Sequence, residues 1–247
     1  MHLRQLAPLL LALAPLLSAA ECEQYSSQRQ PYFGDTHIHT RWSLDASTQG
    51  TRTTPDQAYR FAKGERIGIQ PWTRDGEARR SLQLQRPLDF TMLSDHAELM
   101  GEVNICNNPE LEGHNSWECL VYRNWSRGAF YLFNAYVSFT HSRLGFCGDN
   151  ATGICAQALL EPWREIQQAA ADHNSDDCSF TTFVGYEWTG ITPGTGNWHR
   201  NVLFRTASVP KAPPSFVDQS APEYLWEHLE QECNEADADC DVLIIPH

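Results

Sequence analysis

The chain has 247 residues and a formal net charge of −13, from 31 acidic and 18 basic side chains. Nucleic acids are bound mainly by clusters of Lys and Arg, so this acidic balance excludes nucleic acid as an expected partner. The length is sufficient for one domain with a sizeable hydrophobic core.

The first 20 residues predict a secretory signal peptide. A short basic start is followed by an apolar run of about 12 residues and by small residues that end at Ala20. That run is shorter than the roughly 20 residues that a membrane-spanning helix needs. We therefore expect an exported protein, periplasmic or extracellular, that is free of the membrane after signal cleavage and whose mature part is residues 21–247.

All eight cysteines follow the predicted signal. An even number of cysteines in an exported chain predicts disulfide bonds. No two cysteines form a Cys-x-x-Cys pair, which argues against a zinc–thiolate site. Eight cysteines allow about 105 connectivities, among which the sequence does not choose. Near neighbours offer three candidate pairs: Cys106–Cys119, Cys147–Cys155 and Cys233–Cys240.

Strand and helix signals alternate in the first half of the mature chain. A strand signal covers residues 31–39, and a helix is predicted from Pro55 to Lys63, with Thr54 as its N-cap. Residues 64–87 have the composition of a loop, with a turn at 74–76. A second strand is predicted at residues 88–93.

The alternation continues to the last residues. Residues 116–140 have a mixed periodicity that is compatible with a helix, and 156–173 have the apolar spacing typical of one. Strands at 180–188 and 199–204 flank a short loop and can form a hairpin; a helix at 222–234 and a buried strand at 241–245 follow. This order predicts an α/β fold with a mainly parallel sheet or a barrel.

Histidines and acids gather at the edges of the predicted strands. Residues i and i+2 of a strand point to the same side, so His37 and His39 can bind one metal ion together. A carboxylate such as Glu187 can bridge two ions. The full set is His37, His39, His96, His199 and His247, with Asp35, Asp45, Asp95 and Glu187. The other histidines after the signal lack this context and are interpreted as surface or structural residues: His114, His141, His173 and His228.

These motifs resemble those of the polymerase and histidinol phosphatase (PHP) superfamily. The resemblance rests on residues 35–40 (DTHIHT) with Asp45, on 94–96 (SDH), and on Glu187, His199 and 245–247 (IPH) in the same order. More closely, residues 32–35 (YFGD), 94–98 (SDHAE) and 199–202 (HRNV) are similar to an exported group called domain of unknown function 3604.

The resemblance implies a PHP-like distorted (β/α)7 barrel that holds two or three divalent ions. On this view His37 and His39 bind the first ion, and Glu187 bridges it to a second ion that His199 and His247 also bind. Asp45 and His96 belong to a third ion. Asp35 and Asp95 orient the imidazoles.

This sequence differs from simpler members of the superfamily in two ways. A late Asp-x-His motif of the superfamily does not follow His247, so we expect an N-terminal fragment with a barrel incomplete at its C-terminus. Residues of about 100–178 would be a cysteine-containing insertion over the mouth of the site, in contact with substrate or simply a disulfide-bonded cover.

The predicted function is metal-dependent hydrolysis of a small molecule by water that the ions activate. The resemblance implies that this molecule is a phosphoester, because the known activities of the superfamily are mostly phosphoester hydrolysis. Zn, Mn and Fe all suit imidazole and carboxylate ligands. Arg200 is a candidate clamp for the phosphate, although in a strand it points away from His199; Arg41 is a weaker candidate.

Two other functions stay open at this stage. A metal-dependent amidohydrolase also begins with His-x-His, but many use a carboxylated lysine as the bridging ligand. Lys63 is in a predicted helix and Lys211 in a Pro-rich loop, so neither fits that position. A non-catalytic metal-binding protein is the second alternative, because the final metal motif is missing.

Overall fold

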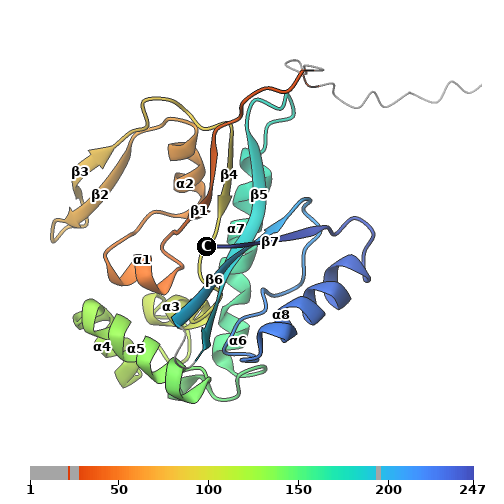
Figure 1. The fold of residues 1–247 in the computed structure, drawn as a ribbon. Coiled ribbons are helices and arrows are strands. Elements are labelled where there is room, and N and C mark those ends of the chain that lie inside the picture. Colours follow the sequence, from red (N-terminus) through yellow and green to blue (C-terminus); the bar gives the residue numbers. More distant parts are fainter. Residues whose placement is uncertain (1–21, 23–27, 193–195) are drawn as a thin grey trace, which may run out of the picture.

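The computed structural model describes Cys22 and residues 28–192 and 196–247, so the predicted signal peptide lies outside the described residues. Its centre is a five-stranded sheet in the order β1-β4-β5-β6-β7 (Figure 1). Strands β1, β4 and β5 are mutually parallel, whereas β6 is antiparallel to both β5 and β7. The strands are β1 (Gly34–Ile38), β4 (Phe90–Leu93), β5 (Thr181–Thr192), β6 (Gly196–Phe204) and β7 (Val242–Pro246).

The prediction of a distorted (β/α)7 barrel is wrong. The described sheet is open, with β1 and β7 at its two edges, and two of the seven described strands belong to a separate sheet. Strands β5 and β6 pair antiparallel, as in the predicted hairpin, whereas neighbouring strands of a barrel of this kind are parallel and need a longer crossover. The resemblance implied the (β/α)7 barrel, and the alternation of strand and helix signals, which predicted a mainly parallel sheet or a barrel, does not encode strand direction.

The prediction of a loop over residues 64–87 is also wrong. This segment forms the antiparallel hairpin of β2 (Ile67–Trp72) and β3 (Ala78–Leu82). The turn predicted at 74–76 is confirmed: Gly76 has a positive φ of 87° and its N–H donates to the carbonyl oxygen of Thr73 at 3.1 Å. The strand signal is weak because β3 is mostly exposed and polar.

Two helices cover one face of the sheet. Helix α2 (Pro55–Ala62) begins as predicted, with a capping box between Thr54 and Gln57, and packs against α7 (Leu160–His173). Trp163 of α7 is fully buried and its ring meets those of Tyr186 in β5 and Phe204 in β6, at 5.9 and 6.4 Å between centroids. These large aromatic contacts form the core behind the central strands.

The remaining helices lie mainly between residues 100 and 178. In Figure 1 most of this region lies below the sheet, beyond the carboxyl ends of β1 and β4, near the short helix α1 (Leu44–Thr48). The helix predicted over residues 116–140 divides at Trp125 into α4 and α5. That the region is an insertion stays a prediction. The helices are α3 (Met100–Asn107), α4 (Trp117–Asn124), α5 (Ser126–Thr140), α6 (Ile154–Ala158) and, near the end of the chain, α8 (Pro222–Leu229), which continues into a π-helical turn, Glu230–Asn234.

Four disulfide bonds connect the eight cysteines. The three candidate pairs of near neighbours are confirmed, and the fourth bond joins Cys22 to Cys178 across 156 residues. Such bonds persist in oxidising compartments, which is consistent with an exported protein. In the part of the chain that the structure describes, no helix has the length and apolar character required to span a membrane.

A buried arginine ties the helical region to the segment before α8. Arg143 is 2% exposed, and its guanidinium donates to Glu102 of α3 at 3.2 Å and to Asp218 at 2.9 Å. Its Nε also donates to the carbonyl oxygen of Asn150 at 2.9 Å. A buried charge is tolerated only when it is paired and hydrogen-bonded in this way.

We expect Arg143→Met to lower the free energy of unfolding by about 3–5 kcal/mol, because it leaves buried Glu102 without its counter-charge. The measurement is urea unfolding followed by circular dichroism. Arg205→Met is the matched control, since Arg205 and Asp241 form an exposed pair and the change should cost less than about 1 kcal/mol. Equal effects of the two substitutions would contradict the importance of the buried network.

Candidate metal centre

Alternation along the strands brings the site residues to one face of the sheet. Tyr186 and Trp188 of β5 are buried, Tyr186 against α7, so Glu187 between them points to the opposite face. His96 follows β4 and forms a parallel bridge with Glu187, while His199 of β6 pairs with Thr189 of β5.

The end of β7 completes this face. His247 directly follows β7, and its N–H donates to the carbonyl oxygen of His199 at 3.3 Å. In Figure 1 the C-terminus accordingly lies in front of the central strands. All seven residues predicted as metal ligands therefore come from this face of the sheet or from α1 beside it.

The carboxylate of Glu187 is the centre of the cluster. The side chain is 1% exposed, and each of its two oxygens faces a different set of imidazoles. Oε2 lies 3.1 Å from His37 Nε2 and 2.8 Å from His39 Nε2. Oε1 lies 2.5 Å from His199 Nδ1, 3.4 Å from His247 Nε2 and 3.7 Å from His96 Nδ1. A carboxylate shared in this way has the geometry of a ligand that bridges two ions.

Asp45 approaches the cluster from α1. Its carboxylate oxygens lie 3.0 and 3.1 Å from His39 Nδ1, and Oδ1 also accepts from the Ser43 hydroxyl at 2.5 Å. This contact places the second ring nitrogen of His39, Nε2, toward Glu187. Carboxylates commonly fix the tautomer of a metal-binding histidine by the same contact. Donor atoms of His39, Asp45 and His96 also lie close enough to share an ion.

The electrostatics of the cluster favour a cation. Burial alone would lower the pKa of His39, but hydrogen bonds with Asp45 and Glu187 outweigh burial and raise that pKa to about 10. Burial likewise opposes ionisation of Asp45 and Glu187, yet their histidine partners hold the pKa of both carboxyl groups well below its usual range. The carboxylates therefore stay ionised and attract positive charge. A divalent ion can supply this charge in place of the imidazole protons, which leave when a histidine binds a metal.

Two further aspartates hold the backbone around the histidines. Asp35 accepts a hydrogen bond from the N–H of His37 at 2.8 Å. Asp95 is fully buried and accepts from the N–H and the hydroxyl of Thr40, at 2.5 and 2.8 Å, and burial raises its pKa to about 6. In the described contacts both aspartates therefore hold the chain before and after His37 and His39. Neither of these contacts is to an imidazole ring.

Two polar residues of the site were missed in the sequence. The Thr189 hydroxyl lies 3.0 Å from Nδ1 of both His96 and His199, and its position two residues after Glu187 in a strand was the available signal. Glu98 Oε2 lies 3.7 Å from His96 Nδ1, while Oε1 accepts from the N–H of Phe216 at 2.9 Å. Glu98 was visible only as part of the 94–98 motif.

The two candidate phosphate clamps lie outside the cluster. The Arg200 guanidinium lies over the ring of Trp198, 5.3 Å from its centroid, as expected for side chains on the strand face opposite to His199. Arg41 is ion-paired with Glu165 at 2.9 Å. A clamp function for Arg200 stays a prediction.

One other group of ligand-type residues is not a free site. Glu102 lies near Cys147 and Cys155, but these cysteines are joined in a disulfide bond and have no thiolate to offer. The histidines interpreted as structural have other neighbours: His114 the carbonyl oxygen of Ile105, His173 Asp56, His141 Phe216 and His228 Tyr224.

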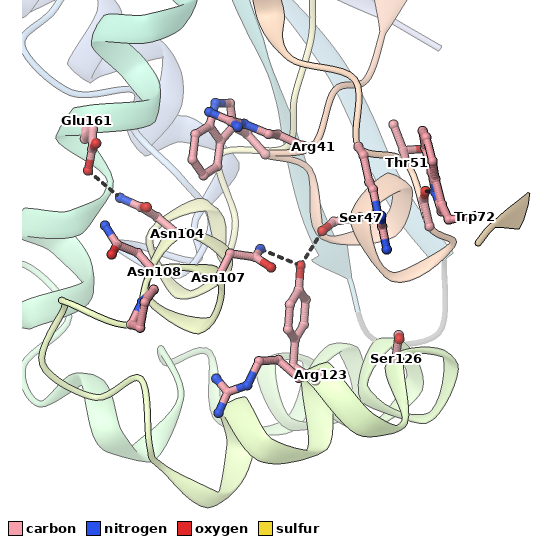
Figure 2. A pocket seen from close by; sticks show the side chains of 15 residues that line it. Arg41, Ser47, Thr51, Trp72, Asn104, Asn107, Asn108, Arg123, Ser126 and Glu161 are labelled. Carbon is pink, nitrogen blue, oxygen red and sulfur yellow. Dashed lines mark hydrogen bonds between the residues drawn. The ribbon is translucent and has the colours of Figure 1, made fainter. Parts of the chain in front are cut away.

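A cavity of about 250 Å³ adjoins the cluster, with Asp45, His96 and His199 in its wall. A larger cavity of about 650 Å³ lies on the other side of α1 and contains none of the clustered residues. Figure 2 shows that side chains of this larger cavity bond to one another, as Asn104 does to Glu161. Of these two cavities, only the smaller one is lined by residues of the cluster around Glu187.

Comparisons with known proteins place the chain in a family without assigning a function. Residues 26–247 match the family described as protein of unknown function (DUF3604), and the chain belongs to this family. No curated protein and no solved structure matches the chain.

We expect purified protein to contain at least about two divalent ions per chain, and His37→Ala/His39→Ala to lose at least one of them, because it removes both imidazoles from Glu187 Oε2. Elemental mass spectrometry gives the count. His173→Ala serves as the control, since His173 pairs with Asp56 away from the cluster. The same metal content in both variants would contradict the site.

Proposed function

We propose that this protein is an exported metal-dependent hydrolase, most simply a phosphoesterase, with a site related to that of the PHP superfamily. The observation that carries the proposal is that one buried carboxylate, that of Glu187, lies within 3.7 Å of five imidazoles. Protein groups of this kind, converging on one strand face, are the ligands that Zn, Mn and Fe prefer. The order of the motifs along the chain supports the relation to the superfamily, and the four disulfide bonds support export to the periplasm or beyond.

The residues divide naturally between two ions. His37 and His39 with Glu187 Oε2 would hold one, and His199 and His247 with Glu187 Oε1 the other. Asp45 and His96 would hold a third ion. Asp45 also contacts Nδ1 of His39 and so fixes the tautomer of that histidine, and this contact does not depend on a third ion.

Paired divalent ions lower the pKa of water and neutralise charge on an attacked phosphoryl group. The protein residues set the geometry for this reaction. Glu187 holds two histidine sets at a fixed separation, Asp45 orients His39, and the Thr189 hydroxyl bonds to His96 and His199. An acidic protein repels phosphate, so local positive charge at this cluster is required for an anionic substrate.

Two other functions compete with this proposal. An amidohydrolase with a carboxylated lysine is disfavoured, because Lys63 lies at the end of α2 against the carbonyl oxygen of His173, and Glu187 already occupies the bridging position. A non-catalytic metal-binding protein would have the same ligands without turnover.

We expect the metal-loaded protein to hydrolyse p-nitrophenyl phosphate or bis(p-nitrophenyl) phosphate, and Glu187→Gln to lower kcat/KM by more than about 100-fold, beyond the loss typical of residues that only orient ligands. Release of p-nitrophenol measures both, and a chelator should abolish activity until metal is returned. Glu223→Gln, on α8, is the control and should retain activity.

Two outcomes would count against the proposal. Turnover of p-nitroanilides without turnover of either phosphate ester would favour the amidohydrolase. Bound metal without turnover of phosphomonoesters, phosphodiesters or amides would favour a metal-binding protein.

A further inference from the structure

The cavity beside the cluster has two chemically distinct parts. One part is formed by ligand-type residues, Asp45, His96 and His199, together with Thr189. The other is apolar: Leu44 at the start of α1, Leu99 before α3, and Phe130 and Val137 of α5. A group bound at the cluster is therefore in direct reach of an apolar wall.

Helix α5 presents a continuous stripe to this cavity. Phe130, Asn134 and Val137 are spaced by four and three residues, so they lie on one face of the helix. Val137 is 3% exposed and Leu99 is 2% exposed, and both belong to the hydrophobic core. Asn134, together with Asn197 from β6, adds uncharged hydrogen-bonding groups.

The charge of the cavity restricts what it can accept. The described residues that line it include no Lys or Arg, while Asp45 and Glu98 contribute carboxylates. A second anionic group on a substrate would find no counter-charge there and would be repelled by Glu98. The volume of about 250 Å³ exceeds the roughly 150 Å³ of an apolar cavity known to bind benzene.

We propose that this cavity binds the uncharged, apolar alcohol part of the substrate, a group of about the size of one substituted six-membered ring. The inference rests on the proposed function and narrows it: the preferred substrates are phosphate esters of small apolar alcohols, rather than esters of polyols or of alcohols with further anionic groups. Burial of the ring against α5 supplies the selectivity, since each methylene in an apolar pocket is worth about 10–200-fold in discrimination.

The first measurement is binding, which needs no turnover. Benzyl alcohol should bind to the protein in saturation-transfer NMR, with and without added Zn²⁺, and glycerol should not. Val137→Phe fills the cavity and should weaken benzyl alcohol binding by at least about 10-fold, whereas Val137→Ala should retain it. Phe130→Ala, at a partly exposed position, removes one wall and is the second variant if Val137→Phe does not fold.

The second measurement is hydrolysis of benzyl phosphate and glycerol phosphate, which are both esters of alkyl alcohols. We expect kcat/KM for benzyl phosphate to be at least about 10-fold higher than for glycerol phosphate, and Val137→Phe to bring the ratio of the two kcat/KM values close to one. Hydrolysis of both esters at equal rates, with no binding of benzyl alcohol, would overturn the cavity assignment and leave the hydrolase intact. Binding of benzyl alcohol that Val137→Phe abolishes, in a protein that hydrolyses neither ester, would support the cavity and count against the phosphoesterase.

Discussion

The contact between Glu187 and five imidazoles is the constraint on which the rest of the site depends. A buried carboxylate is costly unless it is paired, and its partners here come from β1, β4, β6 and β7 or the residues that follow them. The sheet order β1-β4-β5-β6-β7 places β5, and therefore Glu187, in the middle of these strands. A change in the order or register of any neighbouring strand would remove a histidine from Glu187.

Register matters because side chains alternate between faces. Glu187 pairs with Asn201, which in turn pairs with Ile245, while its neighbours Tyr186 and Trp188 lie in the core on the other face. A shift of one residue would bury Glu187 among aromatic rings and direct Trp188 into the cluster. The packing of Trp163 against Tyr186 and Phe204 opposes that shift, so the core behind the sheet maintains the site in front of it.

The helices between residues 100 and 178 contribute to the cavity beside the cluster. Glu98 and Glu102 follow β4, and both are anchored to the segment before α8: Glu98 accepts from the Phe216 N–H, and Glu102 shares Arg143 with Asp218. Helix α3 also packs against α4 and α6, and α5 supplies one wall of the cavity beside the cluster. The disulfide bonds Cys106–Cys119 and Cys147–Cys155 lie within the same region and restrict its rearrangement.

Short sequence patterns correctly predicted several local features of the structure. Thr54 and Pro55 predicted the start of α2, and the turn at residues 74–76 was correct even though its flanking strands were missed. Cysteines close in sequence predicted three of the four disulfide bonds. The seven predicted metal-binding residues all lie in one cluster or at its border, because ligand-type residues at strand ends are a feature that the sequence itself displays.

The arrangement of the whole sheet was decided only by tertiary structure. The predicted hairpin of residues 180–188 and 199–204 implied that β5 and β6 are antiparallel, but nothing in residues 242–246 states that β7 is antiparallel to β6 or that the sheet stays open. The contact of Thr189 with His96, that of Glu98 with Phe216, and the wall that α5 supplies join residues far apart in the chain. By itself the sequence determined which side chains are candidate metal ligands, through residue type and short spacing. Only the packing of the sheet and helices decided which of their atoms meet, because those distances depend on contacts that no local pattern encodes.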